Sequence, residues 1–261
     1  MIYCIFFLIS FGASVVGAVC GIGGGVIIKP VLDAFGMLDV KTINFLSGTT
    51  VLAMSICSFV TTRLKKESLV DMRIGTLLAV GAAAGGVMGK SLFQVLTGAY
   101  DQRYVGGVQA LCLLAVTLAT LIYTIVKEKL PSFQVTNALV CLLVGLVLGV
   151  LSSFLGIGGG PINLGVLFLF FSMPVKTAAQ NSLYIILFSQ ITSLVQTVAT
   201  GSVPKVSVFL LLLMVIGGVG GGVFGRKVSR KIDAEKTNKL FILLMVVIIF
   251  INIYNTYKYL A

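Results

Sequence analysis

Gly21-Ile22-Gly23-Gly24-Gly25 recurs as Gly156-Ile157-Gly158-Gly159-Gly160, 135 positions later in a chain of 261 residues. The residues that follow also match without a gap. Thirteen of the 28 positions from Gly21 to Gly48 are identical in the second copy; besides the five-residue motif these are Ile27, Val31, Leu32, Phe35, Val40, Lys41, Thr42 and Ser47. The chain therefore consists of two copies of one unit, predicted at 1–130 and 131–261 within one membrane domain.

The composition indicates a membrane protein. Hydrophobic residues make up 58% of the chain, charged residues only 10%, and the mean hydropathy is +1.10. A soluble domain carries about 25% charged residues, and here apolar runs of ~20 residues recur along the whole length. We therefore expect an all-α polytopic membrane protein. The net charge of +11 is explained by loops that face anionic lipid, so the expected surroundings are the lipid bilayer and not nucleic acid.

Few residues are available for metal, cofactor or catalytic chemistry. The chain has no His, and its five cysteines are scattered through apolar stretches, which favours a packing role. A Ser–His pair is impossible, and the apolar segments hold no pair of acidic residues. We expect no catalytic residues, no metal and no cofactor, and an intramembrane enzyme is the weakest hypothesis.

The chain divides into ten apolar segments, at 2–20, 26–37, 43–62, 74–96, 105–126, 134–155, 161–173, 178–199, 206–225 and 240–257. The segments 26–37 and 161–173 are too short to cross about 30 Å of hydrocarbon at about 1.5 Å per residue. Each directly follows a GIGGG motif. Each repeat is therefore predicted as a long helix, a glycine break and a half-helix, followed by three transmembrane helices.

The basic residues favour one of two topologies. If the long helix of each broken element spans the membrane alone, the repeats are parallel and the two sides carry 8 and 11 basic residues. If each broken element is re-entrant, the repeats are inverted and the two sides carry 13 and 6. The second division fits the positive-inside rule better. We favour inverted repeats with both termini outside, although 2–20 and 134–155 are long enough to cross alone.

The glycine breaks are candidates for an anion site. Irregular backbone is tolerated at membrane depth only where it is buried in protein or lines a cavity. The free N–H groups and the positive dipole end at the start of a half-helix suit an anion, which glycine allows to approach closely. The predicted site, near the midplane, comprises Gly23, Gly24, Gly25, Gly158, Gly159 and Gly160. The alternative is close helix packing, which we prefer for Gly81, Gly85, Gly86, Gly89 and the run from Gly217 to Gly222.

Polar side chains gather at matching places after both breaks. Lys41 and Thr42, and their counterparts Lys176 and Thr177, begin the next helices, where a lysine either adds to an anion site or extends to the interface. Other polar residues at this depth contact either substrate or neighbouring helices. The substrate candidates among them are Asn44, Ser47, Asn163, Asn181 and Ser182. Gln190 and Gln196 are expected in helix–helix contacts.

Acidic residues are nearly absent from the apolar segments. Only Asp33 lies within one, in the first half-helix, and its counterpart is Phe168. A cation pathway would usually display buried carboxylates, so the pattern favours an anion as the substrate. Asp33 itself is open to two interpretations, a proton-carrying group or a residue near the interface.

The doubled motif, followed by a short apolar run and Val-Lys-Thr, resembles the sulfite exporter TauE/SafE family of membrane permeases, which also has two related halves. Gly21 to Gly25 with Pro30 match the family pattern G-x-G-G-G-x-x-x-x-P, whereas the second copy has Gly165 in place of the proline. The resemblance covers essentially the whole chain. It implies export or uptake of small sulfur-containing anions such as sulfite and organosulfonates across the cell inner (plasma) membrane, without selecting among them.

These observations together predict a secondary transporter of a small sulfur oxyanion that works by alternating access. Coupling to the proton gradient or to the membrane potential is expected. Two alternatives stay open: an anion channel that uses the same glycine site, and a non-transporting membrane scaffold subunit. A homodimer is a further expectation, by analogy with many membrane transporters.

Overall fold

The protein is all helical over residues 2–126 and 133–260, the part of the chain that this computed structural model describes. Its ten described helices match the ten predicted segments to within a few residues, and the predicted boundary between the repeats, at 130/131, lies outside the described residues. The helices are α1 (Ile2–Cys20), α2 (Gly25–Phe35), α3 (Val40–Leu64), α4 (Met72–Ala99), α5 (Gln102–Val126), α6 (Ala138–Leu155), α7 (Gly160–Phe171), α8 (Val175–Ala199), α9 (Val208–Ser229) and α10 (Ala234–Leu260).

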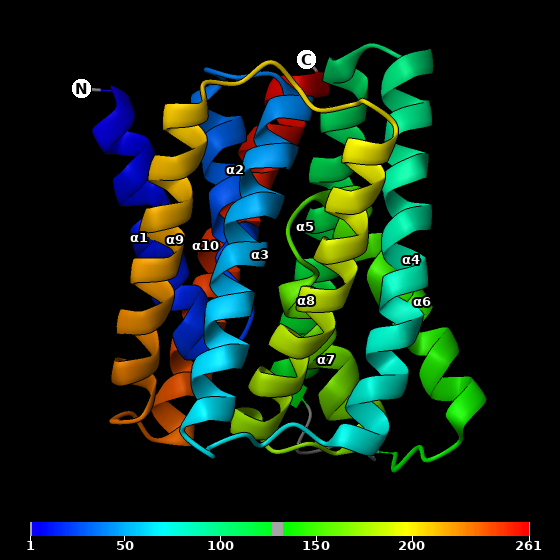
Figure 1. Ribbon diagram of the computed structural model, residues 1–261, viewed down its shortest axis with the longest axis vertical. Helices are drawn as coiled ribbons and strands as arrows, with labels where there is room; N and C mark the ends of the chain where they lie inside the picture. Colours follow the sequence, from blue (N-terminus) through cyan, green and yellow to red (C-terminus); the bar gives the residue numbers. More distant parts are fainter. Residues whose placement is uncertain (1, 127–132, 261) are drawn as a thin grey trace.

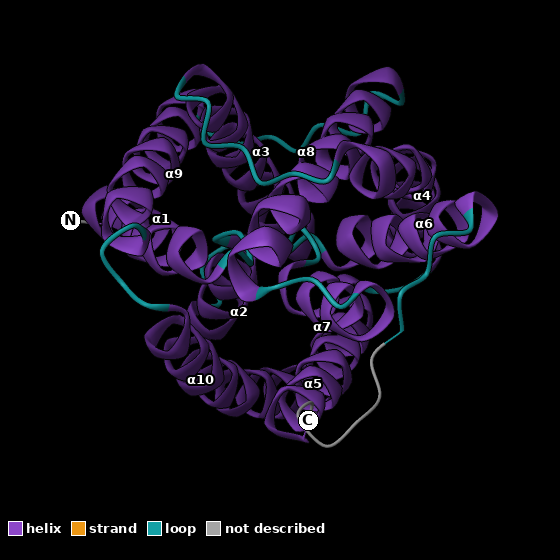
Figure 2. Cartoon of the chain, turned by 90° about the horizontal axis from the view of Figure 1, so that it is seen from below, coloured by secondary structure: helices purple, strands orange, loops and turns teal. Residues whose placement is uncertain are grey.

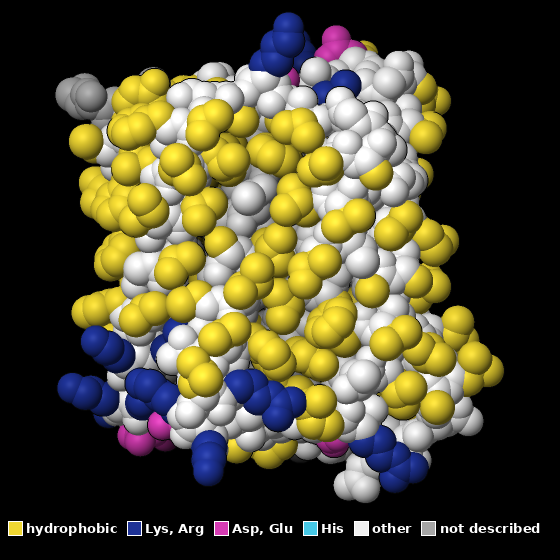
Figure 3. Space-filling model, in the orientation of Figure 1, with side chains coloured by type: hydrophobic (Ala, Val, Ile, Leu, Met, Phe, Trp, Pro, Cys, Tyr) yellow, Lys and Arg dark blue, Asp and Glu magenta, His cyan; other side chains and the backbone are white. Residues whose placement is uncertain are grey.

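Eight of the described helices are long and apolar enough to cross a membrane, all except α2 and α7. These two have 11 and 12 residues, which corresponds to about half of a membrane crossing. Apolar side chains cover the middle of the face seen in Figure 3, while Lys and Arg gather at the two ends. The prediction of an all-α, multi-pass membrane protein is thereby confirmed.

The two ends of the molecule differ in charge. Both chain termini lie at one end of the long axis, here called the terminal end (Figure 1). The opposite end, here called the basic end, carries the α3–α4 connection at 65–71 and most of the Lys and Arg visible in Figure 3. Corresponding helices run in opposite directions, since α3 begins at the terminal end and α8 begins at the basic end (Figure 1).

The first helix of each repeat packs against the fourth helix of the other repeat. α1 lies along α9, and α6 lies along α4. Glycine permits this close approach: a Cβ atom on Gly85 would overlap the carbonyl oxygen of Leu146, and one on Gly221 would overlap that of Phe11. The predicted packing role is confirmed for every glycine of those two groups except Gly220, around which a Cβ atom would fit.

The repeats share a turn even where their sequences differ. At the end of α3, Lys66 has a φ of 55°, and at the end of α8, its equivalent Gly201 has a φ of 62°. The N–H of Glu67 donates to the carbonyl oxygen of Thr62, and the N–H of Ser202 to that of Thr197, each over 3.0 Å. A left-handed residue at this position ends many helices and favours glycine, so the same backbone is built with strain at Lys66 and without it at Gly201.

The two half-helices lie in the centre of the bundle. Figure 2 shows α2 and α7 surrounded by the longer helices. α2 packs against α3 and α10, and α7 packs correspondingly against α8 and α5. The glycine loops that precede both half-helices are therefore enclosed by protein, as irregular backbone at this depth must be.

Candidate functional site: paired cavities around two glycine loops

The two GIGGG loops contact each other. A Cβ atom on Gly25, the first residue of α2, would lie 2.5 Å from the carbonyl oxygen of Ile157 in the other loop. A Cβ atom on Gly160, the first residue of α7, would overlap the carbonyl oxygen of Ile22. Ile22 and Ile157 are both fully buried. The half-helix N-termini therefore meet at one place inside the protein, each against the loop of the other repeat.

The loops are similar but not identical in conformation. Gly21 and Gly156 both have positive φ, of 76° and 66°, and Gly23 and Gly158 follow with 70° and 78°. These values lie in the region that only glycine adopts without strain. The next positions differ, because Gly24 is right-handed with a φ of −71° whereas Gly159 has a φ of 79°.

The start of α7 also carries Pro161 where α2 has Val26. Proline has no N–H group. The second half-helix therefore presents one backbone donor fewer than the first, and the two N-termini are unequal as anion sites.

A cavity of about 460 Å³ opens at the terminal end, between the start of α3, the second half of α4 and the α8–α9 connection. It is called the terminal-end cavity below. Its charged lining residues are Asp39, Lys41, Lys90 and Lys205. Beneath it lies a much smaller pocket of about 20 Å³, the inner pocket, which reaches the second glycine loop. The inner pocket is lined by Asn44, Phe45, Gly48, Thr49, Lys90, Ser153, Gly156, Gln190, Ser193, Leu194 and Thr197.

A second large cavity, of about 290 Å³, opens at the basic end. This basic-end cavity has four charged lining residues, Glu67, Lys176, Arg226 and Arg230. It extends inward to Ala18 and Val19 at the end of α1 and to Ala179 on α8. A Cβ atom on Gly21 would overlap Ala179, so this cavity approaches the first glycine loop from the opposite side.

The terminal-end and basic-end cavities share several equivalent residues, defined here as residues 135 positions apart. The equivalent lining pairs are Lys41 and Lys176, Phe45 and Gln180, Gln94 and Ser229, Ser202 and Glu67, and Pro204 and Leu69. Each cavity has three cationic side chains and one carboxylate. Each is therefore electropositive, which concentrates anions and repels cations.

The cavities differ in how far they are open. Six residues of the inner pocket have equivalents that line the basic-end cavity itself, namely Ala18, Ser58, Thr62, Ala179, Gln180 and Leu183. At the terminal end these positions line the inner pocket. The basic end also has a separate pocket of about 20 Å³ beside its cavity, and six of the residues that line it, Ser58, Phe59, Thr62, Gln180, Leu183 and Tyr184, are equivalent to residues of the inner pocket. At the terminal end, Phe45 and Lys90 line both the terminal-end cavity and the inner pocket.

Four of the sequence-predicted residues line these three cavities. Lys41 and Thr42 line the terminal-end cavity, Lys176 lines the basic-end cavity, and Asn44 lines the inner pocket. Asn44 also lies against the second glycine loop, since a Cβ atom on Gly156 would overlap its side chain. The other predicted residues do not line these three cavities: Gly23, Gly24, Gly25, Gly158, Gly159, Gly160, Ser47, Asn163, Thr177, Asn181 and Ser182.

The helix N-termini next to Lys41 and Lys176 differ. The side chain of Asp39 caps α3 by accepting a hydrogen bond from the N–H of Thr42 over 2.8 Å. α8 begins after Pro174, whose side chain makes no cap. The positive end of α3 is thus already matched by a carboxylate of the chain, while that of α8 has no such partner.

Several predicted residues are buried with polar atoms that lack a protein partner. Asn163 is fully buried, and neither its amide nitrogen nor its oxygen is hydrogen-bonded. The same holds for Asn44 Nδ2, Ser47 Oγ, Asn181 Oδ1 and Ser182 Oγ. Such groups are uncommon, because each loses its hydration on burial. Their concentration close to the two glycine loops and the starts of α3 and α8 is the polar feature that the sequence predicted.

Sequence reasoning missed two cations. Lys90 and Arg226 belong to none of the motifs of the sequence, but both lie within helices and face cavities. Lys90 is 6% exposed, and its Nζ lies 5.0 Å from the ring centroid of Phe93. The signal that could have identified Lys90 is its place inside the apolar segment 74–96, where a charge is costly. Arg226 directly follows the predicted segment 206–225, so its sequence position gave no such signal.

Asp33 is part of a buried ion pair. Its Oδ2 atom lies 2.6 Å from Lys29 Nζ, one turn away on α2, and both side chains are 3% exposed. Tyr259 donates a hydrogen bond to Asp33 Oδ1 over 3.1 Å, and Lys258 Nζ donates to the carbonyl oxygen of Asp33. Asp33 is therefore buried in the protein, and its contacts tie the last turn of α2 to the last turn of α10.

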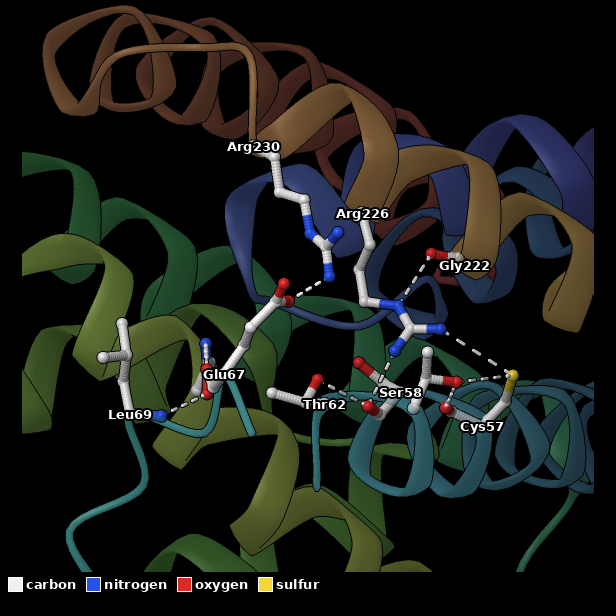
Figure 4. A network of polar contacts seen from close by, with 10 residues as sticks. Cys57, Ser58, Thr62, Glu67, Leu69, Gly222, Arg226 and Arg230 are labelled. Atoms are coloured by element: carbon white, nitrogen blue, oxygen red, sulfur yellow. Dashed lines mark hydrogen bonds and ion pairs between the residues drawn. The ribbon is translucent and has the colours of Figure 1, made fainter. Parts of the chain in front are cut away.

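The polar network at the basic end is shown in Figure 4. Arg226 Nη1 donates to the carbonyl oxygen of Ser58 over 2.7 Å, while Arg230 forms an ion pair with Glu67 across the cavity mouth. The α3–α4 connection is held in place by Gln180, whose Oε1 accepts from the N–H of Leu69 and whose Nε2 donates to the carbonyl oxygen of Glu67.

Comparison with known proteins identifies the family of the chain. The sequence model of the family "Sulfite exporter TauE/SafE" matches residues 6–251. The "Probable membrane transporter protein YunE" of Bacillus subtilis (strain 168) is 25% identical over 275 residues, covering 99% of this chain and 98% of the relative. No solved structure matches the chain. With eight candidate spans, two electropositive cavities and a family match over nearly its whole length, this chain belongs to the sulfite exporter TauE/SafE family of membrane transporters.

Proposed function

We propose that this protein carries a small sulfur oxyanion, such as sulfite or an organosulfonate, across the cell inner membrane by alternating access. The observation that carries the proposal is the pair of cavities at opposite ends of the molecule. Each has three cations and one carboxylate, and they share five equivalent lining positions. One substrate can therefore meet similar chemistry on either side, which is what a carrier requires.

The repeats are inverted in this proposal, and each broken element is re-entrant. This is supported by the opposite directions of α3 and α8, and by the position of both termini at one end (Figure 1). The basic end faces the cytoplasm, because basic loops are retained there. The terminal end then faces outward.

The conformation in this proposal is more open toward the basic end than toward the terminal end. The basic-end cavity is continuous to Ala179, whereas the terminal-end cavity is separated from the inner pocket at Phe45 and Lys90. The inner pocket, of about 20 Å³, has room for little more than one water molecule. A continuous pore would not be divided in this way, so the geometry favours a carrier over a channel.

The binding region of the proposal lies between the cavities. Asn44 and the unpartnered amide and hydroxyl groups near the loops supply hydrogen bonds, and Lys41, Lys90 and Lys176 supply positive potential. The first glycines of the two loops bring backbone close to the cavities, because Gly156 lines the inner pocket and Gly21 lies against Ala179. The later glycines, Gly23 to Gly25 and Gly158 to Gly160, shape the barrier between them.

The test is sulfite counterflow in proteoliposomes. Vesicles preloaded with unlabelled sulfite should accumulate labelled sulfite transiently and saturably, since a carrier exchanges its substrate across the membrane. Labelled sulfite that only equilibrates, without a transient overshoot, would indicate a channel. The proposal would be contradicted if the folded protein produced no sulfite flux and no sulfur oxyanion raised its unfolding temperature.

A further inference from the structure

We propose that Arg226 is the residue that recognises the oxyanion on the basic-end side, acting with Lys176 in the basic-end cavity. This inference rests on the proposed transport function and assigns its specificity to one side chain. Arg226 lies near the end of α9, on the wall of the cavity, and is partly buried. It was not among the residues that the sequence motifs selected.

The guanidinium group is held in a fixed plane by neutral acceptors. Nη1 donates to the carbonyl oxygen of Ser58 over 2.7 Å, Nε donates to that of Gly222 over 3.4 Å, and Nη2 lies 3.8 Å from the sulfur of Cys57 (Figure 4). An arginine has five N–H donors in a rigid fork. These contacts use three, so one N–H on each terminal nitrogen is left to bind a ligand.

The positive charge of Arg226 is not matched by a carboxylate. The four ion pairs recorded for residues 2–126 and 133–260 do not include it. The carboxylate of Glu67, which lines the same cavity from the α3–α4 connection, is paired with Arg230 instead (Figure 4). A partly buried cation that has only neutral partners gains from a counter-anion. The cavity in front of it, of about 290 Å³, is roomy enough for a small oxyanion with some of its water.

The terminal end offers no equivalent fork. The residue equivalent to Arg226 is Ser91, whose hydroxyl accepts a hydrogen bond from Gln196 Nε2 over 3.1 Å. The cation of α4 that lines the terminal-end cavity is Lys90, a point charge without a planar set of donors. Oxyanions bind arginine through two parallel N–H bonds, whereas a spherical anion such as chloride cannot. We therefore assign selection among anions to the basic-end cavity, whereas both cavities attract anions in general.

Arg226 also connects α9 to α3 through Ser58, so a test must separate recognition from stability. The informative variant is Arg226→Lys, which keeps the charge but loses the fork. The matched control is Lys227→Gln, which removes one charge from an exposed neighbouring side chain outside the cavity lining. Each full-length variant is measured for sulfite counterflow, for chloride competition, and for its unfolding temperature with and without sulfite.

We expect Arg226→Lys to raise the KM for sulfite by about tenfold while chloride competition stays the same, because only the bidentate bonds are lost. Arg226→Gln should raise KM further, and Lys227→Gln should leave KM unchanged. A KM within twofold of the native value in folded Arg226→Lys and Arg226→Gln proteins would overturn the inference. If the native protein itself shows no saturable sulfite flux, the proposed function fails instead.

A second variant leaves Arg226 and its structural bonds in place. Ser229→Glu introduces a carboxylate on the same cavity wall, three residues from Arg226 on α9, where it can pair with the guanidinium. We expect Ser229→Glu to raise the KM for sulfite and Ser229→Gln to leave it near the native value. Equal KM values for the two variants would count against Arg226 as the binding residue, even if every Arg226 substitution failed to fold.

Discussion

Gly25 and Ile157 join the two repeats at the centre of the molecule: a Cβ atom on Gly25 would lie 2.5 Å from the carbonyl oxygen of Ile157. The matching contact runs from Gly160 to Ile22. Both obstacles are backbone atoms in fully buried loops, so neither can move aside as the end of a flexible side chain would. Close contact between the loops is therefore a condition of the fold.

Gly25→Ala and Gly160→Ala should each destabilise the protein. Forcing one carbon into packed backbone typically costs about 1–3 kcal/mol, measured as a lower unfolding temperature in detergent. The matched control is Gly12→Ala on α1, where nothing lies within 4 Å of the added Cβ atom. That variant should be as stable as the native protein or more stable by up to ~1 kcal/mol, because alanine favours a helix. Equal effects at Gly12 and Gly25 would contradict the loop contact.

Removing one partner of the Lys29–Asp33 pair should destabilise the protein, whereas replacing both partners by apolar residues should destabilise it much less. Lys29→Met or Asp33→Asn alone leaves a buried charge unpaired, which costs about 3–5 kcal/mol. The second repeat has Leu164 and Phe168 at these positions, so the double variant Lys29→Leu/Asp33→Leu should recover most of the loss. A double-mutant cycle of unfolding free energies measures the recovery.

The same double variant tests whether Asp33 only stabilises the fold or also carries a proton during transport. Neither residue lines the three cavities described above, so we expect the stable double variant to transport sulfite normally. A variant that folds and still exchanges sulfite, but no longer accumulates it against a gradient, would instead identify Asp33 as a proton-carrying group.

Phe45 should control access from the terminal end. It lines both the terminal-end cavity and the inner pocket, and its equivalent at the open basic end is the smaller, polar Gln180. In a cysteine-free background, Phe45→Gln should raise the labelling rate of a reporter Ser193→Cys in the inner pocket. An increase of about tenfold corresponds to about 1.4 kcal/mol in the opening equilibrium. The matched reporter, Ser58→Cys in the basic-end cavity, should label at the same rate with Phe or Gln at position 45. An unchanged labelling rate of Ser193→Cys would exclude Phe45 as the barrier.

Equivalent loops should lie on opposite sides of the membrane. Lys65, after α3, and Thr200, after α8, are exposed equivalent residues. In a cysteine-free background, a membrane-impermeant maleimide added to intact cells should label Thr200→Cys at once and Lys65→Cys only after permeabilisation. Labelling of both from the same side would contradict inverted repeats and would restore the parallel arrangement.

Much of this fold could be predicted from the sequence, because its strongest signals are local. Apolar runs locate the helices, and the repeated GIGGG locates both half-helices. The predicted start of the second repeat's first helix, at 134, is four residues too early. There the N–H groups of Phe133 and Val135 instead donate to the carbonyl oxygens of Leu169 and Phe170, which keeps this segment extended beside α7.

The candidate site was predicted less completely, because burial of a charge depends on the neighbouring helices. Lys90 is buried only because α4 faces the inner pocket at that turn, and Arg226 lines a cavity only because α9 packs beside α3. Neither fact can be read from the spacing along one helix. The polar residues after each glycine break were identified because they cluster at corresponding places in both repeats, whereas the two cations do not occupy equivalent positions.

The packing of α1 on α9, and of α6 on α4, constrains how the chain comes to be folded. α1 cannot pack against its partner until α9, which begins at Val208, has been synthesised. Such long sequence separation slows folding. It also means that one repeat alone would leave its first helix unpartnered, and that two copies could satisfy each other by exchanging that helix. A single repeat with this architecture would therefore need a second copy of itself to cover its first helix.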